Sequence, residues 1–180
     1  MRGPLLSGPL GSQPALEALA RWIGTPDAPI VVLGPPWMGA AIARGGRTLL
    51  LVEPEVRPQA LRTLRRARKE SRPLQVALAA AELPFARGGL PAVVVENVAG
   101  LAIEEAQRWI ASLTPLLRPN GRLIAADATS SDDAAARVAG AFLSAALTNI
   151  VQEWPREGAV LTVGTAAPAS VVAARFDLSA

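Results

Sequence analysis

Residues 29–54 read PIVVLGPPWMGAAIARGGRTLLLVEP, and two short apolar runs enclose a segment with helical spacing. The runs 29–33 and 48–52 have the length and the continuous Ile, Val and Leu content of strands that are buried on both faces. A short helix is predicted between them, over residues 37–44. A strand, a helix and a second strand in this order are typical of a parallel βαβ unit, so the segment predicts an α/β fold.

The same alternation of apolar runs and helical periods continues on both sides of this unit. We expect one α/β domain, doubly wound and Rossmann-like, whose seven-stranded sheet is mostly parallel, with an antiparallel edge hairpin and helices on both faces. The expected helices span 14–23, 58–70, 102–117 and a segment from Ser130 or Ser131 to about 147; the further strands span 74–78, 92–95, 122–126, 148–153 and 159–164, and 170–176 is a candidate extended segment.

The ends of the chain and the helix faces give further expectations. Residues 1–12 are rich in Gly, Pro and Ser and are expected to be a flexible N-terminal tail, so the domain would span 13–180. The apolar positions at helical spacing predict which side chains point inward: Leu16, Leu19, Ala20 and Ile23 in the first helix, Ala60, Leu61, Leu64 and Ala67 in the second, and Ile103, Ala106, Ile110, Leu113 and Leu117 in the third.

Composition excludes several classes of chemistry. The 180 residues include no Cys, no His and no Tyr, which removes a thiolate nucleophile, a zinc site with Cys or His ligands and a Ser-His-Asp triad. The net charge is only +3. A run of basic residues over 57–72 has no interleaved aromatic side chains to stack bases, so we expect a solvated face and no nucleic-acid partner.

No apolar run reaches the roughly 20 residues of a membrane span, and residues 1–9 are interrupted by Gly and Pro where a signal peptide would be continuous. We therefore expect no membrane partner and a cytoplasmic location. A GC-rich bacterial genome would explain the abundance of Ala, Arg and Pro.

Four stretches resemble the class I S-adenosylmethionine (SAM)-dependent methyltransferase family, and together they cover most of residues 28–165. The stretch IVVLG at 30–34, followed by Gly39, looks like the first strand and glycine loop of that family. The stretch LLLVEP at 49–54 looks like its second strand with a terminal acidic residue. Two more stretches, AELPF at 81–85 and LLRPNGRLI at 116–124, are similar to the loop after strand three and to the turn into strand five.

The resemblance implies roles for particular residues. The glycine loop, with Gly34, Pro35 and Gly39, would approach the methionyl part of SAM, and Glu53 would accept hydrogen bonds from the ribose hydroxyls. Glu82 and Leu83 would flank the adenine. The catalytic residues are unassigned, with Glu96 and Asn97 as candidates because they end the fourth strand, where the acceptor would lie.

The glycine loop departs from the family pattern in a way that leaves two functions open. The family has G-x-G-x-G, whereas this chain has GPPWMG over 34–39, in which prolines remove N–H donors and Trp37 adds bulk in a loop expected to face the cleft. The first reading is methyl transfer from SAM to an unknown, small-molecule acceptor. The alternative is a catalytically inactive protein of the same fold, a pseudoenzyme, that acts as a binding or scaffolding subunit with a protein partner or as a homodimer.

A metal site is the weakest of the patterns considered. Asp127, Asp132 and Asp133 are oxygen ligands of the kind that Mg²⁺ prefers. However, Asp132 and Asp133 follow a helix-capping serine, where the helix dipole favours acidic residues. We therefore predict no metal.

Overall fold

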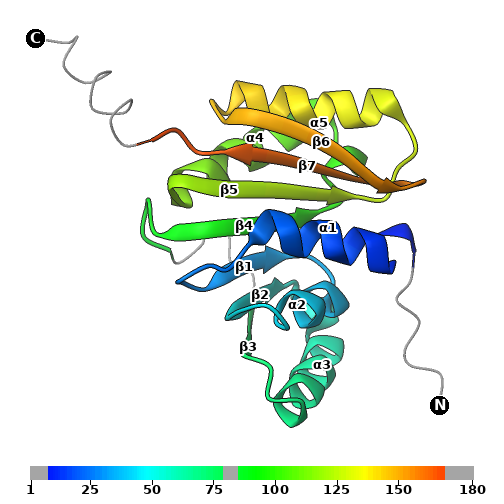
Figure 1. Ribbon diagram of the computed structural model, residues 1–180, viewed down its shortest axis with the longest axis vertical. Coiled ribbons are helices and arrows are strands. Elements are labelled where there is room, and N and C mark those ends of the chain that lie inside the picture. Colours follow the sequence, from blue (N-terminus) through cyan, green and yellow to red (C-terminus); the bar gives the residue numbers. More distant parts are fainter. Residues whose placement is uncertain (1–7, 79–84, 169–180) are drawn as a thin grey trace, which may run out of the picture.

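The computed structural model describes residues 8–78 and 85–168, which form one mixed sheet covered by helices on both faces (Figure 1). The sheet has seven strands: β1 (Ile30–Leu33), β2 (Thr48–Val52), β3 (Leu74–Leu78), β4 (Leu90–Glu96), β5 (Leu117–Asp127), β6 (Thr148–Arg156) and β7 (Ala159–Thr165). The helices are α1 (Gln13–Ile23), α2 (Pro36–Ile42), α3 (Arg57–Lys69), α4 (Ile103–Leu113) and α5 (Asp132–Ser144), with short 3₁₀ helices η1 (Pro9–Gly11), η2 (Pro54–Val56), η3 (Val98–Gly100) and η4 (Thr114–Leu116).

The strand order is β3-β2-β1-β4-β5-β7-β6. Strands β1 to β5 pair in parallel, and β7 pairs antiparallel with both β5 and β6. The chain winds outward from β1 to β3 and then returns to β4 on the other side of β1, which places the topological switch point between β1 and β4. The predicted fold class, including the antiparallel hairpin at the edge, is confirmed.

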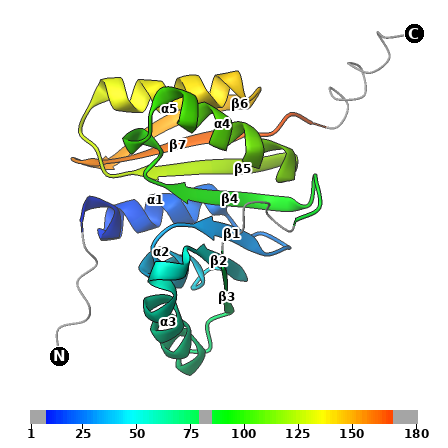
Figure 2. The same cartoon turned by 180° about the vertical axis from the view of Figure 1, so that it is seen from behind.

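Two apolar layers hold the helices to the sheet. Alternate residues of a strand point to opposite faces, so Ile30 and Val32 of β1 pack with α1, α2 and α3, while Val31 packs with α4 and α5. Figures 1 and 2 show these two helical layers from opposite sides. These first three side chains of β1 are at most 1% exposed, which explains why this strand reads as a continuous apolar run.

Element boundaries differ from the sequence prediction where local geometry overrides apolar spacing. Helix α4, expected to reach residue 117, ends at Leu113, because η4 follows it and Leu117 already belongs to β5. Helix α5 ends at Ser144, three residues before the expected end, since Ala146 adopts a left-handed conformation with φ 58°.

Some residues predicted to be buried are exposed, and one predicted to be in a tail is buried. Ile103, the first residue of α4, and Leu61 of α3 are 43% and 38% exposed, so the apolar period of each helix extends beyond its buried face. The segment 8–12 was expected to be part of a flexible tail, yet Leu10 in η1 is only 5% exposed and belongs to the core beside α1. The packed domain therefore begins before residue 13.

Within the described residues, no helix is both long enough and apolar enough to cross a bilayer. The candidate extended segment over 170–176 lies outside the described residues.

Candidate active site

The carboxyl ends of four neighbouring parallel strands form the candidate active site. Because β2, β1, β4 and β5 are adjacent and parallel, their last residues meet at one edge of the sheet. Gly34 follows β1 and Glu53 follows β2, while Glu96 and Asp127 end β4 and β5. Ligands of open α/β sheets bind outside this edge, at the switch point, which here lies between Gly34 and Glu96.

Gly34 is held tightly against β4. A Cβ atom at Gly34 would lie 3.3 Å from Cβ of Glu96 and 3.5 Å from Sδ of Met38. The absence of a side chain at Gly34 therefore keeps the two strand ends close together. The predicted site residues Gly34 and Glu96 are thus brought into contact.

The two prolines serve as the start of a helix. Pro35 is the N-cap of α2 and Pro36 is its first residue, where a missing N–H costs little because the first N–H groups of a helix have no partner within it. The backbone N–H of Met38 donates to the carbonyl of Pro35 at 3.0 Å. The loop between β1 and α2 is therefore only two residues long, and the helix begins where the family pattern would still have a glycine loop.

Gly39 and Trp37 lie elsewhere than the sequence indicated. Gly39 is a buried residue inside α2, and a Cβ atom there would lie 3.1 Å from Cβ and from Cδ1 of Leu50 in β2. The structure thus gives Gly39 a role in the close packing of helix on strand, and its contact with a cofactor stays a prediction. Trp37, expected to face the cleft, is half-buried and packs against the core cluster on the side of α1 to α3.

Glu53 presents an exposed carboxylate at the end of β2. It precedes η2, and its backbone carbonyl accepts a hydrogen bond from the N–H of Val56 at 3.2 Å, which fixes the backbone at the strand end. Its side chain makes no capping hydrogen bond to that helix. The carboxylate is therefore available to a ligand with paired hydroxyl groups.

Glu96 and Asp127 form an acidic pair of strand ends in a poorly solvated environment. Burial, followed by the nearby charge of Asp127, raises the pKa of the half-buried Glu96 carboxyl. Asp127 is 1% exposed, and burial raises its pKa to about 6 even though the backbone N–H of Ala99 donates to Oδ1 at 2.7 Å. Its Oδ2 has no hydrogen-bond partner among the described residues. Carboxyls in such surroundings are better proton acceptors than ordinary ones.

Asn97 turns the chain at the end of β4. It adopts a left-handed conformation with φ 63° and ψ 35°, which asparagine tolerates better than most residues, and its N–H donates to the carbonyl of Ala126 at 3.2 Å. This turn brings the N–H of Ala99 onto Asp127. The side chain of Asn97 is exposed at the same edge as Glu96.

Of the remaining predicted residues, two occupy the start of a helix and two cannot be placed. Asp132 and Asp133 occupy the first turn of α5, whose N-cap Ser131 accepts a hydrogen bond from the N–H of Ala134. Within residues 8–78 and 85–168, no group of three or more acidic residues is gathered as a metal site. Glu82 and Leu83 lie outside the described residues.

From the sequence, Asp127 is a candidate for lining the cleft because it ends the fifth strand, and it is one of three carboxylates considered for a metal. The signal for its burial is its place directly after the apolar run of β5, but an isolated strand end carries no information about which backbone N–H groups reach it. The contact between Ala99 and Asp127 depends on the left-handed turn at Asn97. Asn97 lies two residues before Ala99 in the connection that follows β4.

No protein-family model matches the sequence, and comparison with curated proteins gives no match. Solved structures do match. The S-adenosylmethionine-dependent methyltransferase SibL, in its apo form, superposes with a TM-score of 0.66 at 16% identity, covering 86% of this chain and 57% of its own. The chain has the fold of class I SAM-dependent methyltransferases. This methyltransferase fold is also found in PigF with SAH, at a TM-score of 0.62 and 16% identity, over 84% of this chain and 56% of PigF.

Proteins with the methyltransferase fold catalyse more than one kind of reaction. The [4+2]-cyclase SpnF matches with a TM-score of 0.67 at 10% identity, covering 85% of this chain and 80% of SpnF. The chain spans a little over half the length of SibL and PigF but most of the length of SpnF. The fold is therefore established, whereas the reaction has to be argued from the site.

Proposed function

We propose that this protein binds SAM at the carboxyl edge of the sheet and transfers the methyl group to a small-molecule acceptor. The observation that carries the proposal is the exposed Glu53 carboxylate at the end of β2, one strand from the constricted Gly34 at the switch point. A carboxylate at this position accepts hydrogen bonds from both hydroxyls of a ribose, as acidic residues do in dinucleotide-binding folds.

Each residue at the edge has a role under this proposal. Glu53 would hold the ribose, and Gly34 and Pro35 would border the methionyl part; Glu82 and Leu83 are proposed to flank the adenine. SAM, when bound, supplies a methyl group already activated on a sulfonium. The protein has to align an acceptor with it and remove the acceptor's proton.

Glu96 is the side chain best suited to accept the proton that the acceptor molecule loses. It lies at the switch point, and burial together with the charge of Asp127 raises the pKa of its carboxyl. A carboxylate with a raised pKa matches a proton acceptor that works near neutral pH. Asn97, exposed beside it, would orient the acceptor.

A second function is favoured by the start of α2. Pro35 and Pro36 supply no N–H at the helix end that would otherwise contact a cofactor, and Pro36 is buried. This supports the alternative of a catalytically inactive scaffolding subunit, bound to another protein or to a second copy of itself. A cytoplasmic location stays a prediction under either function.

The test compares Glu53→Gln with Glu55→Gln in their affinity for S-adenosylhomocysteine (SAH), measured by calorimetry. Both residues are exposed and lie two positions apart, so the second variant controls for the loss of one charge. Because hydrogen bonds to a charged group contribute about 1.5–3 kcal/mol, Glu53→Gln should weaken binding by about ten-fold or more. Equal affinities in the two variants would contradict this placement of the ribose.

A further inference from the structure

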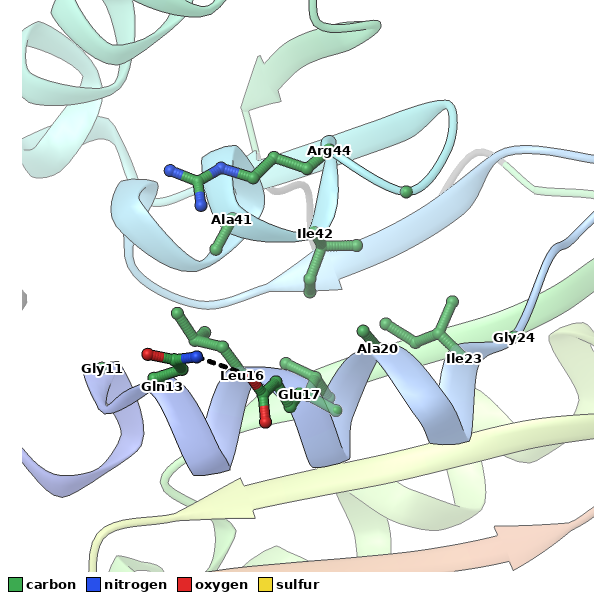
Figure 3. Close-up of a pocket in the computed structure, with 12 residues that line it drawn as sticks. Gly11, Gln13, Leu16, Glu17, Ala20, Ile23, Gly24, Ala41, Ile42 and Arg44 are labelled. Carbon is green, nitrogen blue, oxygen red and sulfur yellow. Dashed lines mark hydrogen bonds between the residues drawn. The ribbon is translucent and has the colours of Figure 1, made fainter.

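A groove lies between α1 and α2, with a volume of about 560 Å³ (Figure 3). Its walls are mainly apolar. Leu16, Ala20 and Ile23 of α1 point across the groove toward Ala41 and Ile42 of α2. This volume and this lining are those of sites that bind small apolar molecules, which typically measure about 300–1,000 Å³.

Helix α1 carries more apolar surface than the sheet covers. Ala15, Ala18 and Leu19 pack against the sheet and are at most 3% exposed. The stripe through Leu16, Ala20 and Ile23, at spacings of four and three residues, was predicted to be core. Instead, Leu16 and Ile23 are half-buried and Ala20 is exposed, and all three line the groove. An apolar stripe left open in this way is typical of a binding surface.

Of the polar side chains that line the groove, Gln13 and Glu17 bond to each other, whereas Arg44 has no ion-pair partner among the described residues. At one end, the Gln13 amide donates to Oε1 of Glu17 at 2.7 Å, so the acidic side chain is already hydrogen-bonded. Arg44 lies on the opposite wall and is exposed. Its guanidinium forms no ion pair with the residues that the structure describes.

A further carboxylate near Arg44, that of Glu70, is also committed to other partners. Glu70, which is close enough to feel the charge of Arg44, accepts a hydrogen bond from Nε of Arg66 at 3.1 Å and forms an ion pair with Arg72. The guanidinium groups of Arg66 and Arg72 therefore already pair with this carboxylate. The positive charge of Arg44 remains available to an anion at the groove.

We propose that the groove between α1 and α2 binds a small apolar acid, such as an acyl carboxylate, with its chain along Leu16, Ala20 and Ile23 and its anionic group toward Arg44. The apolar walls bury the chain, and an exposed guanidinium pairs well with a carboxylate.

The groove is separate from the candidate active site. Helix α2 begins at the carboxyl edge of the sheet with Pro36 and runs away from that edge, so Ala41 and Ile42 lie at its far end and Arg44 follows it. This inference therefore does not depend on the binding of SAM.

The test uses decanoate as the probe and the full chain, with calorimetry as the measurement. Decanoate should bind saturably with a dissociation constant below about 1 mM. Decyltrimethylammonium, which has the same chain and the opposite charge, should bind at least about ten-fold more weakly, since it would be repelled by Arg44. Arg44→Gln should remove this difference between the two probes.

A second variant tests the apolar wall. Ala20→Trp fills the groove from an exposed position and should weaken decanoate binding by about ten-fold or more, whereas Ala136→Trp, at an exposed alanine of α5, should leave it unchanged. The affinity for SAH should be the same in Ala20→Trp as in the wild type, which separates this site from the sheet edge. No binding of decanoate, binding unaffected by Ala20→Trp, or equal binding of the two probes would overturn the proposal.

Discussion

Asp127→Asn is expected to stabilise the protein at pH 8 and to leave its stability nearly unchanged at pH 4. The folded-state pKa of Asp127, about 6, lies above the ordinary value of 3.8, so the folded protein binds this proton more tightly than the unfolded chain does. The free energy of unfolding therefore falls as the pH rises through the window from about 4 to about 6, where the folded state must give up the proton.

The size of the effect follows from the shift. Two pKa units correspond to about 3 kcal/mol, which is an upper figure for the stability that the wild type loses above pH 6. Asparagine is neutral at every pH, and its carbonyl oxygen can still accept the hydrogen bond that Ala99 donates to Oδ1 at 2.7 Å. The substitution replaces only Oδ2, which has no hydrogen-bond partner, by an amide nitrogen. This nitrogen is neutral and finds no acceptor, as is also true of the hydroxyl group of the protonated aspartic acid.

The measurement is urea-induced unfolding of both proteins at pH 4 and pH 8. The stability difference between variant and wild type should grow from near zero to about 2–3 kcal/mol between these two pH values. Glu105→Gln, at an exposed position of α4, controls for the change in net charge. If the stability difference between variant and wild type is the same at both pH values, the pKa of Asp127 is not raised in the folded protein.

Gly121→Ala is expected to destabilise the protein by about 3 kcal/mol, because the new methyl group would collide with backbone atoms. A Cβ atom at Gly121 would lie 2.8 Å from the carbonyl oxygen of Arg118 and 2.9 Å from that of Leu90. These oxygens belong to β5 and to the neighbouring β4, whose register shifts between Leu90 and Ala92. Neither can move away without breaking the pairing of the two central strands.

Gly140→Ala is the matched control for this substitution. Gly140 lies inside α5, and apart from its chain neighbours and the backbone of its own helix no described atom lies within 4 Å of the position that a Cβ would take. Alanine there should stabilise the helix by about 0.5–1 kcal/mol. Thermal unfolding of the two variants should thus shift in opposite directions. A Gly121→Ala variant as stable as the wild type would mean that β4 and β5 lie farther apart at Gly121 than described.

The central strands could be predicted from sequence because burial on both faces leaves a direct mark. The runs at 30–33 and 48–52 are uninterrupted apolar stretches, and each is a strand of the parallel sheet. Helix ends were harder, since they depend on single backbone conformations such as the left-handed turn at Ala146. The side chain of Ile103 matches the helical period yet is exposed, because periodicity does not say how far the covering face extends.

The candidate site was predictable only in part, for a related reason. Strand ends such as Glu53 and Glu96 follow directly from the strand assignment, because parallel strands bring their carboxyl ends together. Gly39 was assigned to a cofactor loop, but Pro35 and Pro36 start α2 early and carry Gly39 into the contact with Leu50. Long-range contacts of this kind have no signature in a single sequence.

Calorimetric titration of SAH into the wild-type protein tests the central claim most directly. A nucleoside site at the carboxyl edge predicts saturable binding of one SAH per chain, with a dissociation constant near or below about 100 μM, which corresponds to about −5.5 kcal/mol. A ligand bound to the folded state must also raise its thermal stability by mass action. No heat of binding and no rise in melting temperature at millimolar SAH would contradict the account and would favour the scaffolding subunit.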